Sequence, residues 1–159
     1  MINPDTKIRY RYMKEADIEI SSSIEVKSNP VPWTKKNFLD CLNRDYYCLI
    51  QEFDSKVSGF AIQSFSLNES HLLNIGIMEA FRKKGLGQEL LDQMIYASES
   101  MGCKRIFLEV RISNDAAIKL YYKLGFKKVS VRKDYYRLPV GREDALILSK
   151  KLKKPWGLF

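Results

Sequence analysis

The spacing of apolar and polar positions changes along the chain, and each change predicts a new element of structure. Ile8, Tyr10 and Tyr12 fall on one face of residues 8–13 and Met13 on the other, an alternation of period two that predicts a strand. Apolar runs between turn residues predict further strands, whereas apolar residues three or four positions apart predict helices. The expected strands cover residues 8–13, 46–52, 57–65, 71–77, 105–111, 127–135 and 144–149, and the expected helices cover residues 14–28, 34–42, 86–101 and 115–124.

The order of these elements predicts a mixed α/β sheet with helices on both faces, not a series of repeated βαβ units. The sequence shows no internal repeat, low-complexity tract or linker, and its 159 residues are enough for one domain with a substantial core. We therefore expect a single domain over residues 1–159, in which residues 150–159 form a basic, aromatic C-terminal tail.

Composition and charge narrow the class of protein. The apolar fraction of 45% and the charged fraction of 29% are typical of ordinary soluble globular proteins. No apolar run approaches the roughly 18 residues of a membrane span, and residues 1–14 lack the apolar core of a signal peptide, so a cytoplasmic location without a membrane partner is expected. The net charge of +8 fits an anionic ligand, nucleic acid or simple solubility. Because no RNA-binding motif or recognition-helix pattern is present, we expect no direct nucleic-acid binding.

Cysteine and histidine offer little obvious chemistry. Cys41, Cys48 and Cys103 are odd in number and form no Cys-x-x-Cys pair, which predicts buried reduced thiols and no metal site. His71 is the only histidine, and it lies at the start of a predicted strand without an obvious partner. We expect it to be a structural or surface residue.

A basic glycine loop is the first candidate binding site. Residues 82–87, Arg-Lys-Lys-Gly-Leu-Gly, lie between an apolar strand and a helix whose apolar stripe begins at Leu86. Glycines allow the backbone to approach an anion closely, and the first N–H groups of the helix point towards it. A Gly-x-Gly spacing also occurs in ordinary tight turns, so both interpretations stay open at this point.

A carboxylate in an apolar strand is the second candidate. Glu109 interrupts the apolar residues 106–110, and a buried carboxylate needs a partner, an adjoining cleft or a raised pKa. The alternative is a structural ion pair with Arg105 or Arg111.

A tyrosine on the following helix could complement this carboxylate. Tyr121 shares a helical face with Ala117, Leu120 and Leu124, whereas Tyr122 is rotated by about 100°. A core tyrosine is the simpler interpretation, but its hydroxyl would need a partner. A carboxylate base and a phenolic acid near a phosphate site would make proton transfer possible.

These blocks together resemble the GNAT N-acetyltransferases. The loop at residues 82–87 is similar to their acetyl-CoA pyrophosphate motif, and residues 108–114 (LEVRISN) with residues 124–126 (LGF) are similar to their second signature. Within that superfamily the chain resembles the RimI-like group, the bacterial ribosomal-protein-alanine N-acetyltransferases. The segments that carry this second resemblance are residues 32–34 (PWT), 74–77 (NIGI), 134–136 (DYY) and 141–145 (GREDA).

The resemblance covers roughly residues 8–148 and implies a fold, a reaction and a set of site residues. The implied GNAT fold is a largely antiparallel, twisted sheet of about seven strands, splayed at the acetyl-CoA site and flanked by about four helices. The implied reaction transfers acetyl from acetyl-CoA, without a metal, to the N-terminal amine of a protein, most directly the N-terminal alanine of a small-subunit ribosomal protein. Glu109 would be the general base and Tyr121 the general acid. The implied acetyl-CoA site consists of Ile75, Gly76, Ile77, Arg82, Lys83, Lys84, Gly85, Leu86, Gly87, Gln88 and Asn114, and the implied acceptor site of Trp33, Tyr135, Tyr136 and Glu143.

Two kinds of alternative stay open. Gln88 stands where a basic residue is common in the family, which would weaken a phosphate contact. Within the same class of enzyme, the acceptor could instead be a lysine, a broader range of protein N-termini or a small amine. A non-catalytic CoA-binding or ribosome-associated protein is the alternative from a different class. The presence of both Glu109 and Tyr121 argues against it, whereas the basic tail keeps it open.

Overall fold

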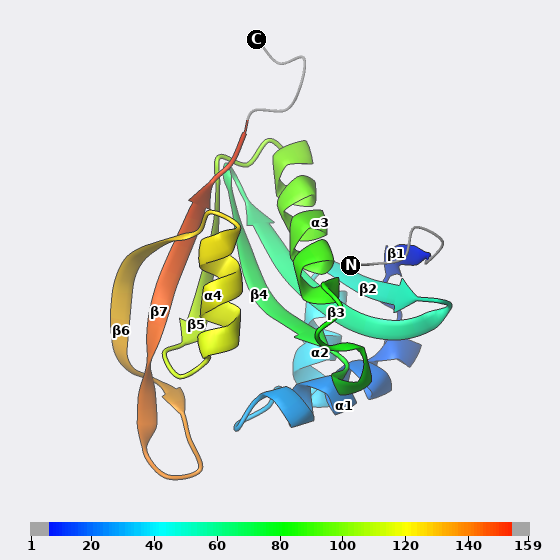
Figure 1. The fold of residues 1–159 in the computed structure, drawn as a ribbon, viewed down its shortest axis with the longest axis horizontal. Helices are drawn as coiled ribbons and strands as arrows, with labels where there is room; N and C mark the ends of the chain where they lie inside the picture. Colours follow the sequence, from blue (N-terminus) through cyan, green and yellow to red (C-terminus); the bar gives the residue numbers. More distant parts are fainter. Residues whose placement is uncertain (1–6, 154–159) are drawn as a thin grey trace. The chain divides into compact units, whose positions relative to one another are not determined.

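A computed structural model describes residues 7–153 of the chain. Over that range it contains seven strands, four α-helices and two short 3₁₀-helices (Figure 1). In chain order these are β1 (Ile8–Tyr12), η1 (Glu15–Asp17), α1 (Ile18–Ser28), α2 (Lys35–Asn43), β2 (Tyr47–Phe53), β3 (Lys56–Ser66), β4 (Glu69–Ile77), η2 (Glu79–Phe81), α3 (Leu86–Ser100), β5 (Arg105–Arg111), α4 (Asp115–Lys123), β6 (Lys127–Arg137) and β7 (Arg142–Lys151).

The strands follow the order β1-β2-β3-β4-β5-β7-β6, and the sheet is mixed, as the sequence predicts. The pairs β1–β2, β2–β3, β5–β7 and β6–β7 are antiparallel, and β4–β5 is parallel. The parallel register joins Glu69–Leu72 to residues 105–108 and ends there, although β4 continues to Ile77 and β5 to Arg111. The interruption of the ladder at this point agrees with the expected splay.

The described chain divides into two compact units, which we describe separately. The first contains residues 7–64 and 74–94, and the second contains residues 65–73 and 95–153. Strands β3 and β4 and helix α3 contribute to both units. The single domain over residues 1–159 stays a prediction.

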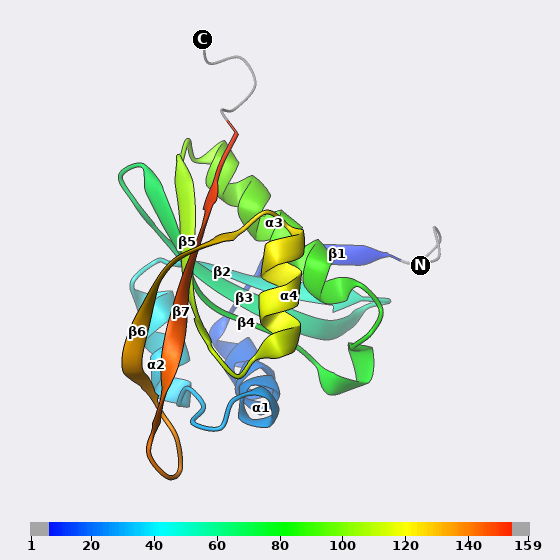
Figure 2. The same cartoon turned by 60° about the vertical axis from the view of Figure 1, so that its left-hand side comes forward.

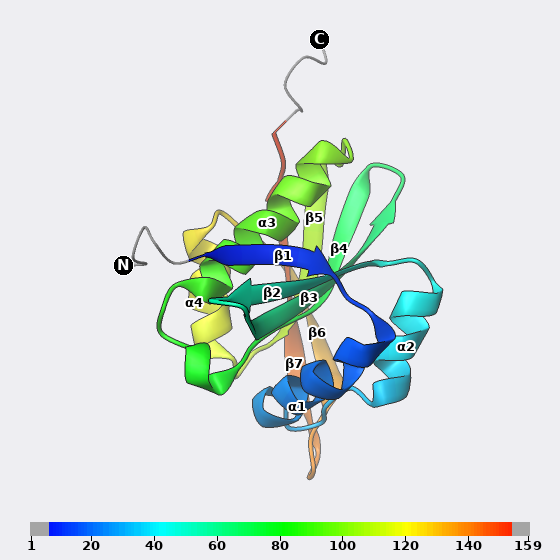
Figure 3. The same ribbon diagram turned by 90° about the vertical axis from the view of Figure 1, so that its right-hand side faces the viewer.

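The first unit is built on the β1–β2–β3 ladder with α1 and α2 beside it (Figure 3). Asp54 and Ser55 form the hairpin turn with φ of 48° and 66°, a left-handed conformation that suits a tight hairpin. Phe38 of α2 packs edge-to-face on Phe60 of β3 at 5.3 Å, and both rings are fully buried. Thr34 caps α2 by accepting a hydrogen bond from the Asn37 N–H, as expected for a helix that starts there.

The predicted alternation fails at the end of β1. Tyr12 is 71% exposed, whereas Met13 is only 5% exposed. The reversal follows from Arg11, which is turned towards two carboxylates and lies 2.8 Å from Asp17 and 2.5 Å from Glu52. Two ion pairs therefore decide the orientation of this strand end, and a period-two pattern does not report them.

The second unit places β5 between β4 and β7, with α4 lying along β5 and β7 (Figures 1 and 2). Asn114 caps α4 by accepting from the Ala117 N–H at 3.3 Å, and Gly125 ends it with a φ of +93°. Strand β7 is longer than predicted, so Lys150 and Lys151 belong to the sheet and not to a tail. The rest of the predicted tail, from Lys154 onward, lies outside the described residues.

Candidate active site

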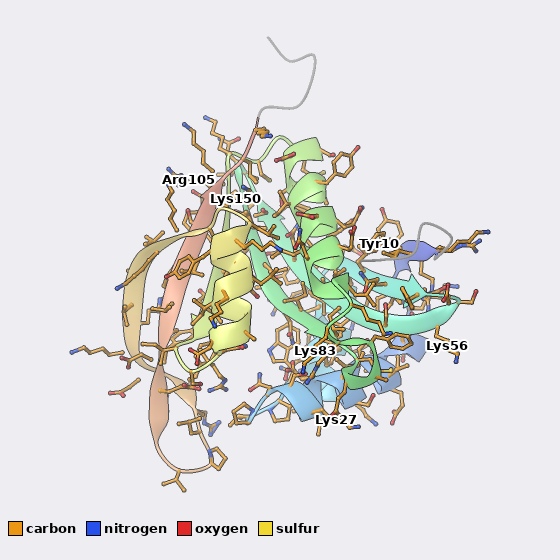
Figure 4. The ribbon with its side chains drawn as sticks, in the orientation of Figure 1. Tyr10, Lys27, Lys56, Lys83, Arg105 and Lys150 are labelled. Atoms are coloured by element: carbon orange, nitrogen blue, oxygen red, sulfur yellow. The ribbon has the colours of Figure 1, made fainter. Side chains whose placement is uncertain are left out.

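The predicted acetyl-CoA residues of the first unit lie at the end of β4, in the loop after η2 and at the start of α3. Lys83, labelled in Figure 4, and Gly85 have φ of +62° and +79°, so the loop turns sharply before the helix. A Cβ at Gly85 would meet nothing within 4 Å, which shows that glycine is needed here for its backbone conformation and not for space. The first helical bond runs from the Glu89 N–H to the Gly85 oxygen, and the N–H groups before it point out of the helix N-terminus. This geometry suits a phosphate group.

The basic side chains of this loop behave differently from one another. Arg82 donates to the Ser28 hydroxyl of α1 at 3.0 Å and to the Ile77 carbonyl of β4 at 3.3 Å, so it braces the loop against two elements. Lys83 and Lys84 are exposed, and within residues 7–153 neither forms an ion pair. The two lysines are therefore available to an anion, and Arg82 is already engaged.

The end of β4 offers a hydrogen-bond donor. The Met78 N–H donates to the Ser58 carbonyl of β3 at 2.7 Å. Successive residues of a strand direct their N–H groups to opposite edges, so the Ile77 N–H points away from β3. Ile77 is one of the predicted acetyl-CoA residues, and its N–H is a donor on the edge of β4 that faces away from β3.

Gly76 has a packing role in the same strand. A Cβ at this position would lie 2.9 Å from both Ile24 of α1 and Phe60 of β3. The strand can approach α1 this closely only without a side chain at Gly76.

The first unit also contains a cavity of about 450 Å³ between α1 and the segment after β4. It is lined by Ser23, Ile24, Lys27, Met78, Glu79 and Ala80. None of the predicted acetyl-CoA residues lines it, so it is not the predicted donor site.

In the second unit the predicted base has a partner that the sequence did not suggest. Nε2 of His71 lies 2.6 Å from Oε2 of Glu109. The expectation that His71 has no partner is therefore wrong, and so is the alternative pairing of Glu109 with an arginine. Arg105 donates to the Ser149 hydroxyl at 3.1 Å, and Arg111 pairs with Glu143.

The parallel register explains the contact. His71 lies opposite Phe107 in the β4–β5 pair, and Glu109 is two residues further along β5, on the same face. A sequence signal existed, because both residues interrupt apolar strands, but it becomes useful only when the register of the two strands is known.

His71 also controls the ionisation of Glu109. The hydrogen bond from His71 outweighs the effect of burial and holds the pKa of Glu109 below its usual range, with a smaller contribution from the charge of Arg132. Glu109 is consequently ionised at neutral pH.

Tyr121 points inward, as the helical-face argument predicts. It is buried against Phe126, with ring centroids 5.6 Å apart, whereas Tyr122 is 46% exposed. Burial raises the pKa of Tyr121, so its hydroxyl keeps its proton. Within residues 7–153 no protein group accepts a hydrogen bond from that hydroxyl.

Three predicted acceptor residues gather around Arg111. Its guanidinium lies 3.0 Å from the Glu143 carboxylate, with both side chains 11% exposed, and 4.4 Å from the centre of the Tyr136 ring. Tyr135 packs edge-to-face on Tyr136 at 5.0 Å. Burial by itself would raise the pKa of Glu143, but hydrogen bonds from Ser113 and Arg111 lower it instead. Glu143 is therefore charged and already neutralised.

The remaining predicted residues have structural contacts of their own. Trp33, in the first unit, packs edge-to-face on Phe38 at 5.4 Å. The side-chain oxygen of Asn114 caps α4, and that of Asp144 accepts from the Asp134 N–H at 2.9 Å.

Comparison with known proteins defines the class. Residues 15–126 match the sequence model of the "Acetyltransferase (GNAT) family", and the chain belongs to that family. It is an acetyl-CoA-dependent N-acetyltransferase with a GNAT fold.

The names of individual similar proteins specify an acceptor, which the name of the family does not. The chain is 36% identical over 137 residues to the "[Ribosomal protein bS18]-alanine N-acetyltransferase" of Salmonella typhimurium, covering 86% of this chain and 93% of the relative. It is 35% identical to the enzyme of the same name from Escherichia coli K12, over 137 residues that cover 86% of this chain and 93% of that relative. The crystal structure of the Escherichia coli ribosomal-protein-S18-alanine N-acetyltransferase has a TM-score of 0.85 and 32% identity, covering 96% of this chain and 99% of that one. The chain is therefore RimI-like, as its sequence blocks indicate.

Residues 7–153 contain neither a candidate membrane-spanning helix nor a candidate metal cluster. None of the helices there combines the length and the apolar character needed to cross a membrane. No cluster of three or more histidine, cysteine or acidic side chains is arranged there to hold a metal ion.

Proposed function

We propose that the chain transfers acetyl from acetyl-CoA to the N-terminal α-amine of a protein, and that the acceptor is the N-terminal alanine of ribosomal protein bS18. The feature that carries the chemistry is the presence, in one unit, of a carboxylate whose pKa is lowered and a buried tyrosine whose pKa is raised. Glu109 is held ionised and Tyr121 is held neutral, which is the pairing that a base and an acid need. The names of the relatives at 35–36% identity support the acceptor.

The donor is held by the first unit in this proposal. Acetyl-CoA supplies the acetyl group as a thioester. Lys83 to Gln88 bind the pyrophosphate, Ile75 to Ile77 bind the acetyl-pantetheine arm through their backbone, and the Ile77 N–H donates to the carbonyl oxygen as it gains charge. Asn114 contributes its amide to the pantetheine end.

An N-terminal amine fits the base better than a lysine does. An α-amine with a pKa of about 8 is roughly one-tenth neutral at pH 7, whereas a lysine with a pKa of about 10.4 is neutral in fewer than one molecule in a thousand. The base then has to accept the proton mainly as the C–N bond forms. Glu109 provides the carboxylate of this base.

Tyr121 protonates the departing thiolate. Burial makes its hydroxyl a weaker acid than a tyrosine in water, but a thiolate in similarly buried surroundings is destabilised for the same reason and becomes a stronger base.

The acceptor peptide is recognised by shape and aromatic contacts. Since Arg111 neutralises Glu143, the β6–β7 region offers no unpaired carboxylate at that position to attract a basic peptide. We assign Tyr135 and Tyr136 to the walls of the acceptor site and Glu143 to holding Arg111 against Tyr136. Trp33 of the first unit is a further acceptor contact in this proposal.

A cytoplasmic location is part of the same proposal. Cys41, Cys48 and Cys103 are free and buried, and burial raises the pKa of Cys48 to about 12, so these thiols suit a reducing compartment.

The test is a panel of acceptors incubated with labelled acetyl-CoA and read by mass spectrometry. The panel contains a peptide copying the bS18 N-terminus, the same peptide with other first residues, an N-terminally blocked peptide with an internal lysine, and a small amine. The proposal expects label on the alanine peptide at a rate at least about tenfold above the others. Preferential labelling of the lysine or the small amine would replace the acceptor, and acetyl-CoA binding without labelling of any acceptor would favour a binding protein.

A further inference from the structure

The hydrogen bond between His71 and Glu109 joins a residue outside the proposed reaction to its base. We infer that the imidazole of His71, and not the carboxylate of Glu109, takes up the proton of the acceptor amine, and that Glu109 orients the ring. The inference rests on the proposed function, whose base it reassigns within the same pair of residues.

The hydrogen bond fixes the tautomer of the ring. An ionised carboxylate only accepts hydrogen bonds, so at 2.6 Å the proton between Oε2 of Glu109 and Nε2 of His71 must belong to the histidine. In the neutral ring Nδ1 then carries the lone pair. The basic atom of the pair is therefore Nδ1 of His71.

Exposure and basicity both favour the ring. The side chain of His71 is 38% exposed and that of Glu109 only 18%, so the ring is the more accessible half and can return a proton to solvent. A carboxylate whose pKa is lowered is a weak base, whereas imidazole is the side chain that most often serves as a general base. In this inference Glu109 stabilises the imidazolium that forms when His71 takes up the proton.

The other charged groups around the pair do not replace this role. Arg132 acts on the carboxylate and not as a partner of the ring, and Arg111 is neutralised by Glu143. Arg132 and Tyr136, both on β6, interact with Glu109, and Tyr136 in turn interacts with Arg111 on β5 and Tyr121 on α4.

The step balances. As the amine nitrogen bonds to the acetyl carbon, its N–H breaks and the proton passes, through water, to Nδ1 of His71. The C–S bond breaks, and the thiolate takes the hydroxyl proton of Tyr121. His71 then loses its proton to solvent and Tyr121 regains one, so the net reaction converts amine and thioester to amide and thiol.

His71→Gln tests the inference because a glutamine amide still donates a hydrogen bond to Glu109 but takes up no proton. Attack needs a neutral amine, so log kcat/KM falls with a slope of about one below the amine pKa in either protein. Where a neutral imidazole is also required, protonation of the ring steepens this fall, so the wild-type slope exceeds that of the variant. We expect His71→Gln to lower kcat/KM at pH 7 by about 100-fold, to show a slope of about one, and to bind acetyl-CoA within about twofold of wild type. Wild-type rate in His71→Gln, or equal slopes, would overturn the inference while leaving the proposed function intact.

A second measurement tests the hydrogen bond between His71 and Glu109 and does not depend on acetyl transfer. The chain has one histidine, so its ring N–H resonance is assigned unambiguously by NMR. In the wild type we expect the ring N–H to be protected from exchange with solvent, and in Glu109→Ala we expect this protection to be lost. Unchanged thermal unfolding of the variant is the control for folding. If the wild type transfers no acetyl, the proposed function fails, and identical ring spectra in the two proteins would separately overturn the inference.

Discussion

Replacement of Tyr121 by phenylalanine removes one hydroxyl from a buried position and leaves the ring contact with Phe126 in place. Because no group among residues 7–153 accepts a hydrogen bond from that hydroxyl, its loss should change the free energy of unfolding by less than about 1 kcal/mol. Its loss from the reaction should be larger. A general acid contributes about 10²–10⁴ in rate, which corresponds to roughly 3–5 kcal/mol of transition-state stabilisation.

Tyr122→Phe is the matched control, because it deletes the same atom one position away on an exposed face. We expect kcat for Tyr121→Phe to fall at least about 100-fold and kcat for Tyr122→Phe to stay within about twofold of wild type. The assay follows thiol release and acetyl-peptide formation under saturating acetyl-CoA, with thermal unfolding recorded for each variant. Equal kcat values for the two variants would refute the assignment of Tyr121 as the acid.

Three further predictions concern Glu109, the glycines and acid stability. Glu109→Gln should lower turnover while the Kd for acetyl-CoA stays within about twofold, as measured by titration calorimetry; a large loss of acetyl-CoA binding would point to a structural role. Gly76→Ala should lower the free energy of unfolding by about 1–3 kcal/mol through overpacking, and Gly85→Ala by about 1 kcal/mol through its positive φ; denaturant unfolding that reverses this order would contradict the packing account. The hydrogen bond from Arg11 lowers the pKa of Asp17 in the folded state, so its contribution is present above the unfolded pKa of about 3.9 and is lost as the pH falls through the folded value. Asp17→Asn should therefore unfold with a weaker pH dependence in that acidic range, and an unchanged dependence would refute the link.

Local patterns predict those parts of the fold that local physics decides. The β5 boundaries and the start of α4 at Asp115 follow from residues within one turn or one strand of each other, and the structure agrees with both. The misplaced Tyr12 shows the limit, because the orientation of Arg11 depends on Glu52, 41 residues away. An alternating pattern carries no information about such a partner.

In the candidate site, too, local features could be predicted from the sequence, whereas contacts between distant residues could not. The turn at Gly85 and the inward face of Tyr121 are local features, and the structure agrees with both predictions. The His71–Glu109 contact depends on the parallel register of β4 and β5, and the Arg111–Glu143 pair spans 32 residues. Both were missed because a sequence shows which residues are available and not which residues face each other.

The most direct test of the central claim is a single peptide that carries both an N-terminal alanine and an internal lysine, based on the bS18 N-terminus. After incubation with labelled acetyl-CoA, tandem mass spectrometry locates the acetyl group on one nitrogen or the other. The account predicts a singly acetylated product with the label on the alanine α-nitrogen. Label on the lysine side chain, or unmodified peptide beside enzyme that binds acetyl-CoA, would contradict it.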